Sequence, residues 1–431
     1  MTRLSFPALL VAATLPLLMP KAAPDVTAAP AREPVIPRDA GSTGPEESAA
    51  PADPSSPDTD GASRDDEATA VGNRPQPVAA RDEPADLLLR DFKPRSMLKV
   101  PAHEVERAAF PAVDVHNHVN DARGGDPPVA VPELLARMDR LNLKRIVILT
   151  GHWGEALQGV VDRMVKPHPD RFTVFTEPDW SRIDEPGFGE AMAAQVRDSF
   201  ARGARGLKVL KSLGLVVRDR TGRLVTVDDP RLDPMWAECG RLGIPVSIHT
   251  SDPDAFFEPL DATNERWDEL GEHPDWSFHG PKFPPKRALL DARNRVFARH
   301  PGTTFIALHV ANHPEDLDDV ESVLDRYPNV VVETGARHAE LGRQPRRARA
   351  FFLKYADRIL FGTDAAPDEA MYRNWFRFLE TADEAFDYWN SPGQGRWTIS
   401  GLDLPRDVLE RVYAKNAERV IPASAGARDR R

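Results

Sequence analysis

The sequence predicts an α/β protein and, within that class, a (β/α)8 TIM barrel, a ring of eight parallel strands that alternate with helices. After residue 111, short apolar runs of strand character alternate with amphipathic segments. Eight such runs can be counted, and several end in a histidine, an aspartate or a lysine. Repeated strand–helix alternation implies parallel strands, and eight units complete this barrel. An open doubly wound sheet is the alternative architecture.

The predicted strands are separated by segments of helical character. One amphipathic segment, at residues 131–142, precedes the second strand, and another, at 314–328, precedes the seventh. The eight strands are predicted at residues 112–118, 145–152, 172–178, 204–211, 245–250, 303–310, 329–336 and 358–365.

Residues 1–28 have the pattern of a secretory signal peptide. Arg3 precedes an apolar core, and small residues follow that suit a cleavage site. An uncleaved membrane anchor is the alternative, but the apolar run is short for a span and is interrupted by Pro7 and Pro16. The sequence therefore predicts an exported protein, periplasmic or secreted, which is membrane-anchored only if the segment is retained.

A disordered linker is predicted at residues 29–85, because Pro, Ala, Ser, Asp and Glu dominate there and large apolar residues are nearly absent. The folded domain is predicted at 86–422, followed by a flexible tail at 423–431. Within the domain, the segment near 252–287 is long for a strand–helix loop and predicts a lid-like insertion. The single cysteine, Cys239, supports no disulfide framework.

The formal net charge of −11 argues against nucleic acid as a partner. The partner expected is a small-molecule substrate, with no membrane span after signal cleavage. The sequence is also compatible with a homo-oligomer, because barrel helices need no special signature to pair.

The first predicted strand carries polar residues at every second position. In AVDVHNHVN, residues 112–120, Asp114, His116 and His118 are expected to share a face that looks into the barrel, with valines on the opposite face. Two imidazoles buried side by side repel when charged and compete for donors when neutral. A metal ion between them removes that conflict, so the pair predicts metal ligation. Asp114 is expected to orient a ligand histidine or to cap the barrel interior, without ligating the metal itself.

Three later strands end in matching polar residues. His249, His309 and Asp364 lie near the ends of strands five, six and eight. Each shares a face with a small residue two positions earlier, while bulky residues occupy the opposite face. In a barrel of this type the active site lies at the carboxyl ends of the strands, which is where these groups fall.

Several basic residues are candidates for substrate binding. Lys208 is expected to face inward on strand four, as a substrate contact, as a carboxylated lysine bridging two metals, or as a buried lysine paired with an acid. We favour one metal over two. Arg337 and Arg343, after strand seven, are candidates for holding an anionic group, with structural salt bridges as the alternative.

At these residues the sequence resembles the amidohydrolase superfamily, in particular its amidohydrolase-related branch, amidohydrolase family 2. The resemblance covers residues 111–421 and rests on DVHNH, IHT, ALHV, FGTDA and VYAKNAERV in that order. It implies His116, His118, His249 and Asp364 as metal ligands. It also implies His309 as the catalytic histidine or an additional ligand, and Asp364 as a catalytic residue.

By this resemblance we expect hydrolysis of a lactone, ester or amide bond by metal-activated water. Asp364 would take the proton of the water, while His309 would polarise or protonate the substrate. Three imidazoles and one carboxylate suit one divalent ion, Zn²⁺ first, with Mn²⁺ or Fe²⁺ as alternatives.

Two other functions remain open at this point. The first is non-oxidative decarboxylation of a small carboxylic acid, with His309 supplying a proton to carbon. The second is an exported ligand-binding barrel without catalysis, which is disfavoured because it has no use for Asp364 beside a metal.

Overall fold

A computed structural model describes residues 88, 92, 94–119 and 130–424. The chain divides into two units, and all described helices and strands belong to the unit that contains residues 99–431. The described residues of the other unit, residues 18–98, form no helix or strand. The predicted signal peptide lies outside the described residues, as does nearly all of the predicted linker and tail, so these stay predictions. Among the described residues, no helix combines the length and the apolar character that a membrane crossing requires.

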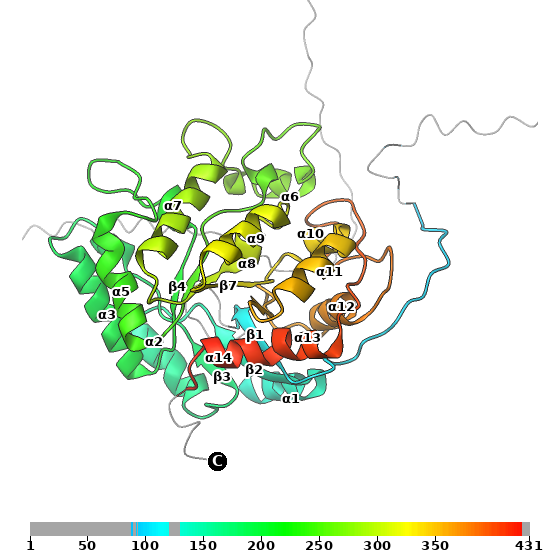
Figure 1. Ribbon diagram of the computed structural model, residues 1–431, viewed down its shortest axis with the longest axis horizontal. Helices are drawn as coiled ribbons and strands as arrows, with labels where there is room; N and C mark the ends of the chain where they lie inside the picture. The colour runs from blue at the N-terminus through cyan, green and yellow to red at the C-terminus, as the bar shows by residue number, and fades with distance from the viewer. Residues whose placement is uncertain (1–87, 89–91, 93, 120–129, 425–431) are drawn as a thin grey trace, which may run out of the picture. The chain divides into compact units, whose positions relative to one another are not determined.

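All eight predicted strands are present and pair in parallel in two sheets, of order β1-β2-β3 and β4-β5-β6-β7-β8. Several of them are labelled in the middle of the ribbon in Figure 1. Backbone bridges join Thr176 to Leu207 and Asn117 to Ala365, so β3 meets β4 and β8 meets β1. These contacts close the ring and confirm the predicted α/β barrel. The strands are β1 Ala112–Asn117, β2 Leu143–Ile148, β3 Phe172–Val174, β4 Leu207–Val209, β5 Val246–Ile248, β6 Phe305–Ala307, β7 Val330–Glu333 and β8 Ile359–Leu360.

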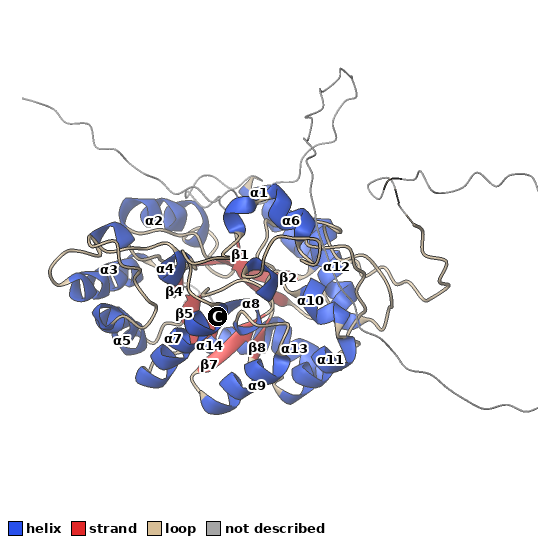
Figure 2. Cartoon of the chain, turned by 90° about the horizontal axis from the view of Figure 1, so that it is seen from above, coloured by secondary structure: helices blue, strands red, loops and turns tan. Residues whose placement is uncertain are grey.

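Helices surround the strands, which lie at the centre in Figure 2. The sequence prediction of helices before strands two and seven is met by α1 and α9. The helices are α1 Val131–Leu141, α2 Gly154–Val160, α3 Phe188–Arg202, α4 Ser212–Leu215, α5 Asp233–Leu242, α6 Trp267–Glu272, α7 Lys286–Arg299, α8 Leu308–Ala311, α9 Leu317–Arg326, α10 His338–Arg343, α11 Pro345–Lys354, α12 Glu369–Glu380, α13 Arg406–Glu410 and α14 Asn416–Val420.

The two faces of the strands pack into separate apolar clusters. Outward side chains such as Ile146 and Val246 join a large cluster with the helices. Inward side chains such as Val147, Phe175 and Leu360 form a smaller cluster that fills the inside of the ring. This division follows from the two-residue period of a strand and leaves the carboxyl ends of the strands for polar side chains.

The first strand does not keep strict alternation, and the expectation that Asp114 shares a face with the histidines is wrong. The register of β1 against β2 shifts between Asp114 and Asn117. The Asp114 carboxylate turns to the helix layer, where it accepts hydrogen bonds from Tyr372 on α12 at 2.7 Å and from Thr363 Oγ1 at 2.7 Å. Val113 and Val115 both join the inner cluster, so Asp114 between them faces outward, and the two-residue period breaks only where His116 follows Val115. Asp114 still supports His116, through the backbone N–H of that residue at 3.1 Å.

The segment predicted as a lid, near 252–287, contains α6 and a small apolar cluster of its own. Phe256, Leu270, Trp276 and Phe278 pack there against one another and their neighbours. Arg266, which is almost fully buried, pairs with Glu340 on α10. The segment therefore has its own core and is attached to the loops that follow β7, while its role as a lid stays a prediction.

Candidate metal centre

The residues predicted to bind a metal converge at the carboxyl ends of β1, β5, β6 and β8. Asp364 Oδ1 lies 2.9 Å from His116 Nε2 and 2.8 Å from His118 Nε2. His309 Nε2 lies 3.3 Å from His249 Nδ1 and 3.8 Å from Asp364 Oδ2. The structure thus brings all five predicted residues into one cluster.

The hydrogen bonds of the other ring nitrogens assign a tautomer to three of the imidazoles. His116 Nδ1 donates to Glu333 Oε1 at 3.1 Å, and His309 Nδ1 donates to the Gly335 carbonyl at 2.8 Å. His249 Nε2 donates to Asp252 Oδ1 at 3.2 Å. A neutral imidazole carries one N–H, so in each ring the nitrogen that faces the cluster is left with a lone pair.

This arrangement fits a cation. Two lone pairs on His249 Nδ1 and His309 Nε2 face each other at 3.3 Å and cannot hydrogen-bond in these tautomers. A divalent ion of the zinc class accepts such nitrogens together with one carboxylate oxygen. Two groups with ligand atoms close enough for one ion are His116, His118 and Asp364, and His116, His309 and Glu333.

The electrostatics of the cluster point the same way. Burial lowers the pKa of His249 to about 4 and holds the pKa of His309 well below its ordinary value, so both rings are neutral and available as ligands. Burial also acts to lower the pKa of His116, but the Asp364 carboxylate outweighs it and the pKa is raised. For Asp364, burial acts to raise the pKa and His116 holds it far below its usual range. The Asp364 carboxylate therefore favours a cation beside His116 Nε2, where a metal ion and a proton would compete.

Two of the clustered residues have left-handed backbone. The φ angle is 56° at His309 and 57° at Asp364, and Val310, Ala311 and Asn312 also have positive φ. Such conformations cost about 1–3 kcal/mol each and persist only where the surroundings enforce them. Asn312 provides part of that support, because its side chain accepts from Thr250 N at 3.1 Å and donates to the Ser251 carbonyl at 2.7 Å.

The other strands of the barrel, β2, β3 and β4, bring a second polar group to the mouth beside the cluster. Lys208 is 1% exposed, and its ammonium makes no hydrogen bond or ion pair with any described residue. Burial lowers the pKa of Lys208 to about 8, although Asp364, Glu333 and Glu177 act to raise it. Glu177 follows β3, and its carboxylate accepts from the backbone N–H of His152 at 3.0 Å.

Sequence reasoning did not single out His152, Glu177 or Glu333. The signal was present, since all three stand at the carboxyl ends of predicted strands, where Asp364 was recognised. His152 also has left-handed backbone, with φ of 54°, and its ring lies 3.4 Å from Glu177 Oε2.

The two candidate arginines after β7 have different positions. Arg337 is 6% exposed and interacts electrostatically with Asp364 and Asp252, so it lies beside the cluster. Arg343 instead pairs with Glu265 at 2.7 Å and lies over the Trp397 ring. Arg343 therefore holds the 252–287 segment against its neighbours and is not brought into the cluster.

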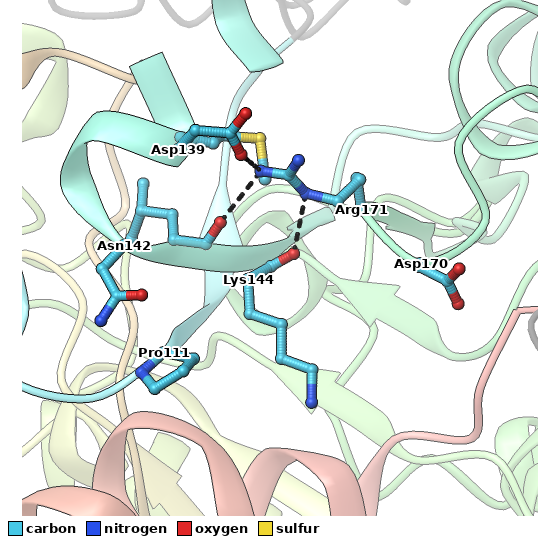
Figure 3. Close-up of a pocket in the computed structure, with 8 residues that line it drawn as sticks. Pro111, Asp139, Asn142, Lys144, Asp170 and Arg171 are labelled. Carbon is cyan, nitrogen blue, oxygen red and sulfur yellow. Dashed lines mark hydrogen bonds and ion pairs between the residues drawn. The ribbon is translucent and has the colours of Figure 1, made fainter. Parts of the chain in front are cut away.

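A surface pocket of about 450 Å³ lies at the amino-terminal ends of the first strands, where Pro111, Leu143 and Arg171 line it (Figure 3). Arg171 donates there to the carbonyl of Lys144 at 3.1 Å and pairs with Asp139 at 2.8 Å. None of the predicted site residues lines this pocket.

Solved structures with a similar fold share little sequence with this chain. An uncharacterised TIM-barrel protein from Bordetella bronchiseptica is 19% identical and has a TM-score of 0.43, over 72% of this chain and 97% of its own. A 2,6-dihydroxybenzoate decarboxylase from Rhizobium is 17% identical (TM-score 0.44; 72% and 98% covered). A dihydroxybenzoic acid decarboxylase from Polaromonas sp. JS666, with bound manganese, is 16% identical (TM-score 0.44; 72% and 97% covered).

No curated protein matches the sequence. A family model does match, over residues 57–423, and its description is amidohydrolase. That span includes every strand of the barrel and every residue of the cluster. The chain belongs to the amidohydrolase family.

Proposed function

We propose that this chain is a metal-dependent enzyme that removes the carboxyl group of a small organic acid without oxidation. The observation that carries this proposal is the Lys208 ammonium, buried beside the ligand cluster without a hydrogen bond or ion pair to any described residue. An unpaired buried charge costs several kcal/mol, and a substrate carboxylate in contact with it would offset that cost. Such a contact would bring a substrate carboxylate next to the candidate metal centre.

The chain supplies the groups that the reaction needs. In decarboxylation the bond from carbon to the carboxyl group breaks, its electron pair stays on carbon, and a proton takes the place of CO2. We propose that water supplies this proton and that His309 and Asp364, whose Nε2 and Oδ2 atoms lie 3.8 Å apart, take it up and pass it to the carbon. A divalent ion, when bound, stabilises negative charge that develops on substrate oxygens. Lys208 and Arg337 would orient the acid in the site.

Hydrolysis is the second candidate, and one observation favours it. The Asp364 side chain is 23% exposed, so its carboxylate can reach a water molecule as a general base. His309 beside it can then pass a proton to the leaving group. The substrate in this case would be a lactone, ester or amide that carries a separate carboxylate for Lys208.

One experiment separates the two reactions. The full chain, loaded with Zn²⁺ or Mn²⁺, is screened against aromatic and unsaturated carboxylic acids and against carboxylate-bearing lactones, esters and amides, in ¹⁸O-labelled water. Decarboxylation releases CO2 and leaves no ¹⁸O in the organic product. Incorporation of ¹⁸O into the organic product, without release of CO2, contradicts decarboxylation and supports hydrolysis. Turnover that persists in the Asp364→Asn variant would contradict both assignments.

A further inference from the structure

Glu333, the last residue of β7, joins two ligand residues from different strands. It has no exposed surface. Its Oε1 atom accepts from His116 Nδ1 at 3.1 Å and from the backbone N–H of His309 at 2.6 Å. Its Oε2 atom accepts from the backbone N–H of Gly335 at 2.5 Å. One carboxylate therefore contacts the ring of one ligand and the backbone of another.

These contacts indicate that Glu333 acts as an acceptor and not as a metal ligand, although it lies close enough to His116 and His309 to be considered one. Both of its oxygens already point at N–H groups, and the His116 nitrogen that it contacts is the one turned away from Asp364. A carboxylate behind a ligand histidine fixes which nitrogen carries the proton and how the ring is oriented.

Two glycines beside Glu333 leave space for its carboxylate. A Cβ atom at Gly362 would lie 2.4 Å from Glu333 Oε2, and one at Gly335 would lie 2.7 Å from it. Neither distance is tolerated between real atoms, so glycine at both positions leaves the space that Glu333 occupies.

We propose that Glu333 is a positioning residue that sets the tautomer of His116 and the left-handed backbone of His309, and thereby the affinity of the centre for a divalent ion. The proposal rests on the metal-dependent function above. It adds a link between β1 and β6 that passes through β7, a strand that contributes no predicted ligand.

The test is the Glu333→Gln variant of the full chain, with Zn²⁺ affinity measured by competition against a chelator. An amide cannot replace this carboxylate, because in either orientation its NH₂ group faces a backbone N–H. Loss of a partner that orients a ligand costs about 10- to 100-fold in metal affinity. We expect a loss in that range. In the metal-free proteins, at a pH high enough to leave the His116 ring neutral, ¹⁵N NMR of labelled histidine should show the Nδ1–H form in the wild type and a mixture of tautomers in the variant.

Two further variants keep the result interpretable. Glu340→Gln removes another buried acid, one that pairs with Arg266 and touches no ligand histidine, and should leave Zn²⁺ affinity unchanged. Glu333→Ala removes the acceptor without adding a donor and serves if the amide variant does not fold. Wild-type affinity and a wild-type His116 tautomer in a folded Glu333 variant would overturn the inference. A wild type that binds no metal would instead overturn the proposed function.

Discussion

The buried polar side chains on the two sides of the barrel mouth differ in their hydrogen-bond partners. On the side of β1, β5, β6 and β8, imidazoles and a carboxylate contact one another, and the outer nitrogens of three of the four rings are held by Glu333, Asp252 and a backbone carbonyl. On the side of β2, β3 and β4, a buried ammonium has no such partner among the described residues. We propose that the first side holds a cation and that the second side receives an anionic substrate.

We interpret this difference as that between a site for a resident ion and a site for a substrate that binds and leaves during turnover. Groups that face a resident ion are fixed by several neighbours, because ligand geometry must persist between reaction cycles. A group that faces a substrate must be free when the substrate leaves. Lys208 fits the second description, and each prediction below tests one side of the mouth against the other.

The largest effect is expected from the double variant His116→Ala, His118→Ala. About one zinc-class ion per chain should bind to the wild type and be lost in the variant, because two nitrogen ligands are removed from one ion. Elemental analysis of the purified chains measures this. His168→Ala, in a loop outside the cluster, should keep the ion. Two ions per wild-type chain would favour Lys208 as a carboxylated, bridging ligand and would contradict the division between the two sides.

Asp364→Asn should lower turnover by about 10²- to 10⁴-fold, the usual contribution of a positioned acid or base. Asparagine tolerates the left-handed backbone at this position, so the fold should be kept. Substrate affinity should change little, since Lys208 still binds the carboxylate. Steady-state kinetics separate the two effects, with Asp139→Asn, on α1, as the control. A large rise in KM with unchanged kcat would place Asp364 on the binding side.

Lys208→Met should weaken the binding of carboxylate substrates or inhibitors by about 10- to 100-fold, the value of a charged hydrogen bond of roughly 1.5–3 kcal/mol. Metal content should stay at the wild-type level, because we place Lys208 outside the ligand set. Calorimetric titration measures the first quantity and elemental analysis the second. Lys144→Met, at the opposite end of the barrel, should change neither. Loss of the ion in Lys208→Met would show that Lys208 belongs to the metal site and would contradict the division into two sides.

The smallest effect is on stability. The pKa of Lys208 is lowered to about 8 by burial, so the unfolded chain binds more protons than the folded chain between pH 8 and 10.5. Stability of the metal-free wild type should therefore rise with pH across that window. Lys208→Met should lack this rise and be more stable at pH 7 by up to about 3 kcal/mol. Chemical denaturation at several pH values tests this. A rise of equal size in both proteins would show that Lys208 is not the source.

Much of the fold and of the ion-binding side could be predicted from the sequence. The strand pattern is local, and the carboxyl ends of parallel strands must meet at one edge, so His249, His309 and Asp364 could be brought together without coordinates. The position of Asp114 could not, because the irregularity in β1 depends on the contacts of Asp114 with Tyr372 and Thr363, far away in sequence. Local alternation carries no information on such a break.

The other side of the mouth was harder to predict for a different reason. A single histidine or glutamate at the end of a strand is common, whereas two histidines at adjacent inward positions are not. His152 and Glu177 can be recognised as candidate site residues only because they lie close to each other and to Lys208. These contacts join three strands, so the local sequence does not reveal them. Arg343 shows a different difficulty, since a basic residue after a barrel strand can equally hold a neighbouring loop, and its pair with Glu265 matches the salt bridge that the sequence left as the alternative.

The left-handed turn that begins at His309 has a consequence for how the protein acquires its ion. Four consecutive non-glycine residues in this conformation are unfavourable on their own. The side chain of Asn312, the last of the four, attaches the turn to the loop after β5, and Glu333 on β7 binds the backbone N–H of His309. The turn can form only after those strands have docked. A partly folded chain therefore presents His116 and His118 without His309, and the complete ligand set appears only in the closed barrel. We therefore expect the protein to take up its metal ion only after the ring of strands has closed.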